Sequence, residues 1–203
     1  MKILISIMLT TLCFCSAFIS SPALASPLKN YDRGHFSVDA GGTIPTSLSF
    51  SEYMNPKKAA SFYFGATAGL GGNTALNYRM NRYRTSGPEK ITVNQLNLMH
   101  KLLPQLAVYA GYVNTRTNVN DMPGSSNSGQ IGLQARVDIP LLFTVWGQAG
   151  IGNKLNSWEI GVSKALFNNI DLSVSYYDSI FKNLPQDGES KARGINAGLS
   201  VKF

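Results

Sequence analysis

The feature that most constrains the fold is an unbroken alternation of apolar and small or polar residues over positions 194–203. One face of an extended strand carries Ile195, Ala197, Leu199, Val201 and Phe203, and the other carries Asn196, Gly198, Ser200 and Lys202. Side chains of a strand point alternately to its two faces, so this segment presents a continuous apolar face that ends in an aromatic ring. A strand that closes a barrel inside a lipid bilayer needs such a face.

Segments with similar alternation recur along the chain. They lie at 36–41, 62–70, 76–81, 95–98, 106–113, 130–139, 143–151, 158–163, 170–177 and 194–203. A tilted transmembrane strand needs about 9–11 residues, and no stretch shows a sustained helical period. We therefore predict an all-β fold, a closed antiparallel transmembrane up-and-down β-barrel of about ten strands, with eight strands as the alternative.

The connections between these segments alternate in length. Tight turns are predicted at 71–73, 103–105, 140–142 and 167–169, and longer polar connections at 45–59, 84–90, 115–129 and 179–192. The Gly- and Ser-rich stretch within 115–129 reads as a flexible loop. Short turns at one end and long loops at the other are typical of outer-membrane barrels, so we expect 45–59, 115–129 and 179–192 to be extracellular loops.

The N-terminal segment has the pattern of a secretory signal peptide. A basic start is followed by an apolar stretch and by the small residues Ala23 and Ala25 of an Ala-x-Ala cleavage site. We predict a cleaved signal peptide at 1–25 and a single barrel domain at 26–203, with an uncleaved membrane anchor as the alternative. Both cysteines of the chain fall inside the signal peptide, so we expect no disulfide in the mature protein.

The charge of the chain indicates its partners. The formal net charge is +7 and charged residues make up 14% of the chain, while the mean hydropathy is −0.03. Basic residues gather at 57–58 and 79–84. Nucleic acid is not an expected partner of an exported chain, and basic segments flanked by aromatic residues favour the anionic head groups of outer-membrane lipids.

Aromatic residues on the outward face are expected to lie at two depths. The girdle near the long connections would hold Phe62, Tyr112, Trp158 and Tyr176, and the girdle near the short turns would hold Phe36, Phe143 and Phe203. A bilayer favours two aromatic girdles around an aliphatic band. The alternative is that these rings fill the core of a soluble β-sandwich.

Together, the signal peptide, the alternating strands, the rhythm of turns and loops, and the last strand ending at Phe203 resemble the small outer-membrane β-barrel proteins of diderm, Gram-negative-type bacteria. These are the OmpA- and OmpX-like, porin-like barrels. The resemblance covers 26–203. It implies a monomer in the bacterial outer membrane. It also implies contact with periplasmic chaperones and the barrel assembly machinery, for which a strand ending in Phe203 resembles the assembly signal.

The inward face is predicted to hold a balanced charge network of Asp39, Arg79, Lys101, Arg136, Asp138, Glu159, Asp171 and Lys202. Charges inside a narrow barrel must be paired, so we favour a salt-bridge network over a selectivity constriction in a pore. Glycines share this face at Gly65, Gly69, Gly111, Gly132, Gly150, Gly161 and Gly198. We expect them to make room for bulky inward side chains rather than for a ligand.

No catalytic residue, metal site or cofactor is predicted. His35 and His100 are the only histidines, and neither has a serine and an acid at matching depth. We therefore predict an integral outer-membrane β-barrel with a structural or surface-interaction role, and not an enzyme. The alternative is a narrow porin-like channel for small solutes. An outer-membrane lipid-modifying enzyme and a soluble exported β-sandwich adhesin are less favoured.

Overall fold

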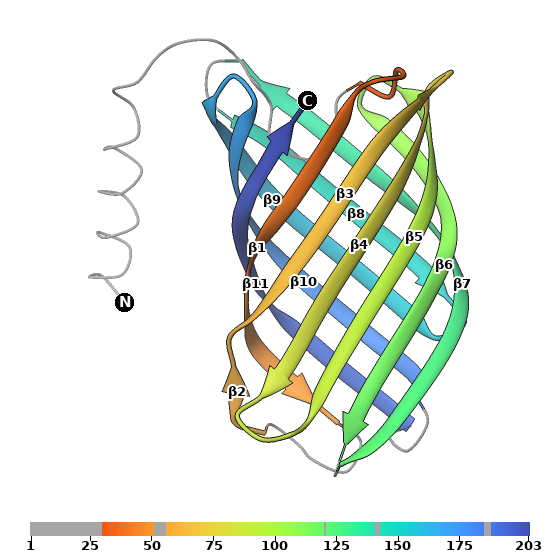
Figure 1. Cartoon of the computed structure of the whole chain (residues 1–203), viewed down its shortest axis with the longest axis vertical. Helices are drawn as coiled ribbons and strands as arrows, with labels where there is room; N and C mark the ends of the chain where they lie inside the picture. Colours follow the sequence, from red (N-terminus) through yellow and green to blue (C-terminus); the bar gives the residue numbers. More distant parts are fainter. Residues whose placement is uncertain (1–29, 51–55, 120, 141–142, 185–187) are drawn as a thin grey trace.

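The computed structural model describes residues 30–50, 56–119, 121–140, 143–184 and 188–203. Ten long antiparallel strands form one closed barrel, and the two-residue strand β2 lies beside the end of β4 (Figure 1). The strands are β1 (Phe36–Ser49), β2 (Lys58–Ala59), β3 (Ser61–Gly71), β4 (Thr74–Thr85), β5 (Lys90–Leu103), β6 (Leu106–Val119), β7 (Met122–Ile139), β8 (Phe143–Gly152), β9 (Leu155–Phe167), β10 (Ile170–Leu184) and β11 (Gly188–Lys202). No helix among the described residues is long and apolar enough to cross a membrane.

The barrel closes between its first and last strands. β1 and β11 pair from Ser37 opposite Lys202 onward. The N–H of Phe36 donates to the carbonyl of Phe203 at 3.1 Å, and the N–H of Phe203 donates to the carbonyl of Phe36 at 2.8 Å. Each long strand therefore has a neighbour on both sides, which leaves no open sheet edge. The predicted closed barrel of about ten strands is confirmed.

The tight turns gather at one end of the barrel, which we call the short-turn end. The turns predicted at 71–73, 103–105 and 167–169 are confirmed, and of 140–142 only Pro140 is described. In the first of these turns Asn73 has φ 62°, in the left-handed region that asparagine tolerates better than most residues. The predicted signal peptide, with its cleavage residues, lies outside the described residues and stays a prediction.

At the opposite end, which we call the long-loop end, the loop predicted at 115–129 is wrong. β6 continues to Val119 and β7 begins at Met122, so the segment is mostly a β-hairpin. Pairing across the hairpin satisfies the backbone N–H and C=O groups. On the outer face of the hairpin, the side-chain amide of Asn114 donates to that of Asn127 at 2.7 Å. The polar composition that indicated a loop therefore also suits a strand whose outer face meets water.

The other two connections predicted as extracellular loops are also shorter than predicted. Most of 179–192 belongs to β10, which ends at Leu184, and to β11, which begins at Gly188. Within 45–59, the residues up to Ser49 belong to β1 and Lys58–Ala59 form β2. Residues 51–55 lie outside the described residues. The long-loop end is therefore built largely from strands that extend the barrel.

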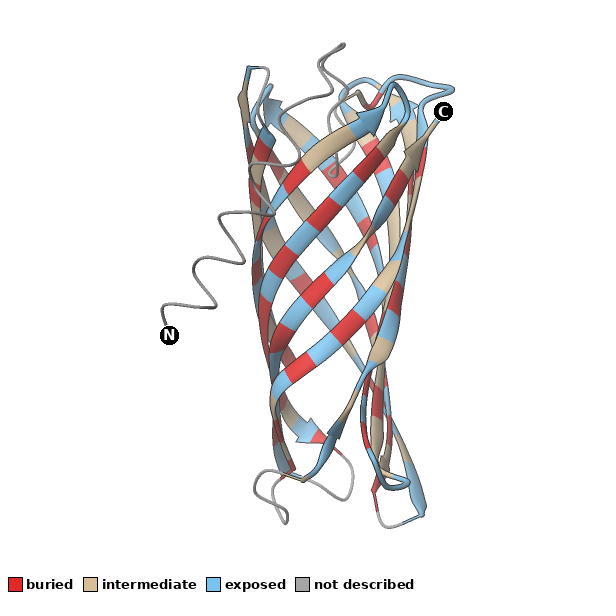
Figure 2. Cartoon of the chain, turned by 90° about the vertical axis from the view of Figure 1, so that its left-hand side faces the viewer, coloured by how far each residue is buried: buried red, intermediate tan, exposed pale blue. Residues whose placement is uncertain are grey.

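The apolar face of the strands changes sides part-way along the barrel. In β5, Leu96 is exposed on the outer wall, whereas Ile91 and Val93 are buried inside. The apolar residues change from the inner to the outer face of β5 at the adjacent polar residues Asn94 and Gln95. Buried and exposed residues alternate along the strands in Figure 2, but the chemistry of the two faces is exchanged beyond this point.

In β1 a bulge accompanies the same exchange. The register with β11 shifts between Pro45 and Ser47, and the extra residue turns Leu48 inward, where it is fully buried. The part of the barrel toward the short-turn end is apolar outside and polar inside, as a bilayer requires. The part toward the long-loop end is polar outside and apolar inside, as water requires. β7, with 18 residues, is long enough to span both parts.

Candidate functional site: the lumen and the outer wall

A buried ion pair crosses the centre of the lumen. Arg79 of β4 lies 2.6 Å from Glu159 of β9, measured from a guanidinium N–H nitrogen to Oε2. The two strands lie on opposite sides of the ring, since the order between them is β4, β3, β1, β11, β10, β9. Glu159 also accepts hydrogen bonds from Gln148 at 2.8 Å, Ser175 at 2.5 Å and Asn196 at 3.0 Å. The carboxylate is thus held from four directions.

Two further ion pairs lie toward the short-turn end. The Nζ of Lys202 is 2.5 Å from Oδ2 of Asp171, and a terminal guanidinium nitrogen of Arg136 is 2.7 Å from Oδ1 of Asp138. Thr144 also donates to Asp138 at 3.0 Å. The structure therefore brings six of the eight charged residues selected from the sequence into three ion pairs inside the barrel.

The segment before β1 folds into the short-turn mouth of the barrel. Tyr31 is 3% exposed, and its hydroxyl lies 3.5 Å from Gln134 and 3.9 Å from the sulfur of Met99. The Nζ of Lys101 lies 4.4 Å from the centre of the Tyr31 ring, and the N–H of Gly71 donates to the Tyr31 carbonyl at 2.8 Å. Burial raises the pKa of Tyr31 to about 12, so its hydroxyl is neutral at pH 7.

An apolar cluster fills the lumen at the long-loop end. Its members are Leu48, Phe50, Tyr83, Ile91, Val93, Val113, Val119, Leu155, Tyr177, Phe181, Leu184 and Ala192. The ring of Tyr83 lies 5.3 Å from that of Tyr177 and 6.0 Å from that of Phe181, centre to centre. The sequence analysis did not select this cluster. The signal that marks it is the exchange of apolar faces in the strands that supply it.

Two small cavities lie between these layers of described residues. One, of about 50 Å³, extends from the central ion pair toward Tyr31 and is also lined by Asp39. The other, of about 20 Å³, extends toward Phe181. Both are lined by Arg79 and Glu159, so the central ion pair borders both. Each has room for a few water molecules at most.

Four of the seven predicted inward glycines make room for inward rings: Gly132, Gly150, Gly161 and Gly198. A Cβ atom on Gly150 would lie 2.5 Å from the hydroxyl of Tyr109, and one on Gly161 would lie 2.6 Å from the indole of Trp146. Real Cβ atoms do not come this close to other heavy atoms. The space beside these glycines is therefore filled by protein side chains.

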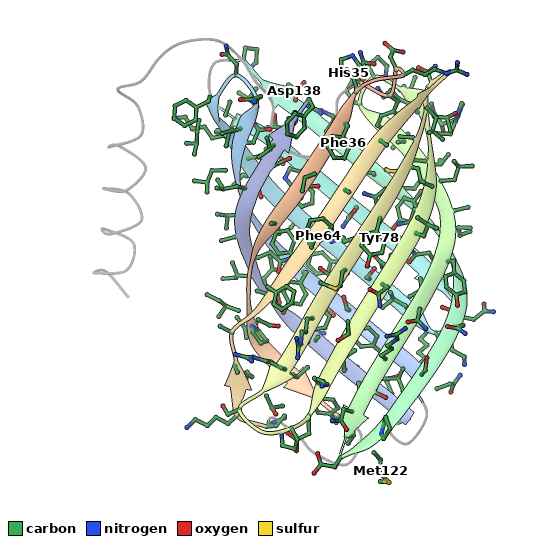
Figure 3. All side chains as sticks on the ribbon, viewed as in Figure 1. His35, Phe36, Phe64, Tyr78, Met122 and Asp138 are labelled. Atoms are coloured by element: carbon green, nitrogen blue, oxygen red, sulfur yellow. The ribbon has the colours of Figure 1, made fainter. Side chains whose placement is uncertain are left out.

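The predicted girdle residues all lie on the outer wall and are exposed. They are Phe62, Tyr112, Trp158 and Tyr176, and Phe36, Phe143 and Phe203. Figure 3 shows Phe36 toward the short-turn end, Met122 at the long-loop end, and Phe64 and Tyr78 between them. Outward rings thus also occur outside the predicted set, and Tyr78 lies in register with Tyr112 through Leu96. The role of these rings at a membrane interface stays a prediction.

The two histidines lie away from the central polar layer. Both are exposed, and the ring nitrogen Nδ1 of His100 lies 3.2 Å from the hydroxyl of Thr74. Within the described part of the chain, no group of three or more His, Cys, Asp or Glu side chains is placed to hold a metal ion.

Comparison with known proteins gives likenesses of structure alone. No protein-family model and no curated protein matches the chain. Neisserial surface protein A is 17% identical, over 84% of this chain and 100% of that one, with a TM-score of 0.49. Ail, the attachment invasion locus protein of Yersinia pestis, is 10% identical over 84% and 99%, with a TM-score of 0.40. The outer membrane protein OprG from Pseudomonas aeruginosa is 10% identical over 87% and 99%, with a TM-score of 0.29. Likenesses this distant add nothing to the geometry of the barrel itself.

Proposed function

We propose that this protein is an integral β-barrel of the bacterial outer membrane with a closed lumen. Its role would be structural, or surface interaction through the long-loop end, and not catalysis. The outer wall supports a membrane location, because Ile131, Leu133 and Val137 of β7 all expose their apolar side chains. A soluble protein seldom exposes a continuous apolar band of this kind, whereas a bilayer requires it.

The observation that carries the proposal is that side chains fill the lumen at three successive levels. Tyr31 fills the short-turn mouth, the ion pair between Arg79 and Glu159 crosses the centre, and the cluster around Phe181 fills the long-loop end. A porin-like channel needs a continuous water-filled path. The two cavities beside the ion pair, of about 50 and 20 Å³, are each too small to supply one.

A conductance measurement tests this closure. We expect the protein in planar lipid bilayers to give no stable single-channel steps. The variant Tyr31→Ala is the matched control, since it opens only the first of the three levels and should also stay silent. Reproducible steps from the unmodified protein would favour the porin-like alternative. Steps from the variant alone would show that the central and long-loop levels leak.

Epitope labelling tests which end faces outward. An epitope inserted between Asp121 and Met122, in the β6–β7 turn, should bind antibody on intact cells, because the long-loop end is proposed to be extracellular. The same epitope between Gly72 and Asn73, in the β3–β4 turn, should bind only after the cells are permeabilised. The reverse pattern would contradict the proposed orientation and the surface role.

A further inference from the structure

Outward residues on β4, β5 and β6 form rows of changing chemistry. Residues in register across these strands give the rows Leu76–Leu98–Ala110, Tyr78–Leu96–Tyr112, Met80–Asn94–Asn114, Arg82–Thr92–Arg116 and Arg84–Lys90–Asn118. Toward the long-loop end the wall thus changes from aliphatic to aromatic, then to largely amide, then to basic. The same order is found from the hydrocarbon core of a leaflet through its interface to the charged head groups.

The two basic rows place four cations close together. Arg84 lies directly opposite Lys90 across β4 and β5. Arg82 and Arg116 flank Thr92 from its two sides. Like charges that face each other on neighbouring strands repel and destabilise the sheet unless an anion lies between them. We call Arg82, Arg84, Lys90 and Arg116 the basic patch.

No described carboxylate neutralises the basic patch by an ion pair, although carboxylates neutralise other cations of the outer wall. On β11, Lys191 pairs with Glu189 at 3.1 Å, and Arg193 pairs with Asp178 at 2.7 Å. Nearer the patch, Glu89 accepts a hydrogen bond from the hydroxyl of Thr85 at 2.5 Å. The patch therefore differs from the neighbouring cations of β11, which are neutralised by Glu189 and Asp178.

The guanidinium groups of the patch are positioned by local contacts. Arg82 lies 5.7 Å from the centre of the Phe62 ring, and its Nε is buried without a hydrogen-bond partner among the described residues. The Nε of Arg116 donates to Asn114 at 3.2 Å, and the Nε of Arg84 donates to the carbonyl of Ala60 at 2.9 Å. These contacts hold the side chains against the outer wall, and the ring of Phe62 lies beside Arg82.

We propose that the basic patch binds the phosphate groups of lipid head groups in the leaflet at the long-loop end. The proposal rests on the proposed function, because lipid reaches this wall only if the barrel spans a membrane. Guanidinium and ammonium groups are the side chains that recognise phosphate. They lie two and three rows beyond the outward aromatic row, on its long-loop side, which is the side of the lipid head groups. Phosphates bound there remove the repulsion between the facing cations.

Lipid binding by the full chain in neutral detergent micelles tests the site. The probe is diphosphorylated lipid A, with dephosphorylated lipid A as the comparison, and bound lipid is counted by native mass spectrometry. We expect dephosphorylated lipid A to bind more weakly than diphosphorylated lipid A. We also expect that millimolar inorganic phosphate does not displace the diphosphorylated lipid. Because each cation near a membrane surface contributes about fivefold to affinity, the double variant Arg84→Gln, Lys90→Gln should bind about 25-fold more weakly.

The double variant Lys154→Gln, Lys182→Gln is the matched control. It removes two cations at the same end of the barrel, on the side of β8 to β10, and should change affinity less than threefold. Equal loss in both variants, or no loss in the first, would overturn the site. Displacement by free phosphate would make it an anion site rather than a lipid site and would equally overturn it. A shift in gel migration on boiling shows for each variant that it is folded. Failure of the unmodified chain to insert into membranes would overturn the proposed function itself.

Discussion

Replacing Glu159 with alanine is expected to lower the free energy of unfolding by about 3–5 kcal/mol, the usual cost of leaving a buried charge without its partner. The charge left behind is that of Arg79, whose partner lies 2.6 Å away across the lumen. The change also removes the carboxylate that accepts hydrogen bonds from three neutral donors, Gln148, Ser175 and Asn196. Unfolding by urea in lipid vesicles, followed by the fluorescence of the two tryptophans, measures the effect.

Two further variants separate the charge from other effects of the change. Ser157→Ala lies two residues away on the same inward face of β9 and should change the unfolding free energy by no more than about 0.5 kcal/mol. The double variant Arg79→Met, Glu159→Leu should recover part of the loss, because removing both partners leaves no unpaired charge. A loss below about 1 kcal/mol for Glu159→Ala would contradict a central role for the ion pair.

Removing Phe203 is expected to lower the unfolding free energy by about 2–4 kcal/mol. Phe203 exchanges two backbone hydrogen bonds with Phe36 where the barrel closes, each contributing about 0.5–1.5 kcal/mol. The two rings stack with centres 5.4 Å apart, which contributes about 0.5–1.5 kcal/mol more. In cells we expect the amount of membrane-inserted protein to drop by about tenfold or more, since a 1.4 kcal/mol difference already changes an equilibrium tenfold. The effect is larger in cells because the closing strand is also the proposed assembly signal.

Phe167→Ala is the control for this change. Phe167 lies on the outer wall at the same end and is 67% exposed, close to the 65% of Phe203. It is not in the closing pair of strands, so its loss should leave stability and insertion nearly unchanged. Normal insertion of the chain without Phe203, or equal losses from the two changes, would count against a special role for this residue.

The alternation of residues predicted most of the fold because a strand has only two faces. Stretches such as 130–139 and 194–203 are apolar on one face throughout, which fixes both the strand and the side that meets lipid. The same alternation placed Arg79, Glu159, Asp171 and Lys202 inside. It could not pair them, because their partners lie on strands far apart in sequence, and closure of the ring decides which strands face each other.

The long-loop end shows where a single rule of alternation fails. The predicted strands all carry their apolar side chains on the outer face, so the stretches beyond the bilayer were predicted as loops. Ile91 and Val93 carry the opposite phase because that part of the barrel buries its apolar side chains inside. Tyr31 precedes the first alternating segment, so periodicity gave no signal for it, and its place in the mouth depends on contacts with β3, β5 and β7.

The proposed function requires a closed barrel that spans the outer membrane. Gel migration of the protein, extracted from the membrane fraction and loaded with and without boiling, tests it most directly. We expect the protein in the washed membrane fraction, with the unboiled sample migrating at a different position from the boiled one because the folded barrel resists detergent. Recovery of the protein in the soluble periplasm, with no shift in migration on boiling, would contradict a membrane-spanning barrel and favour a soluble exported β-sandwich.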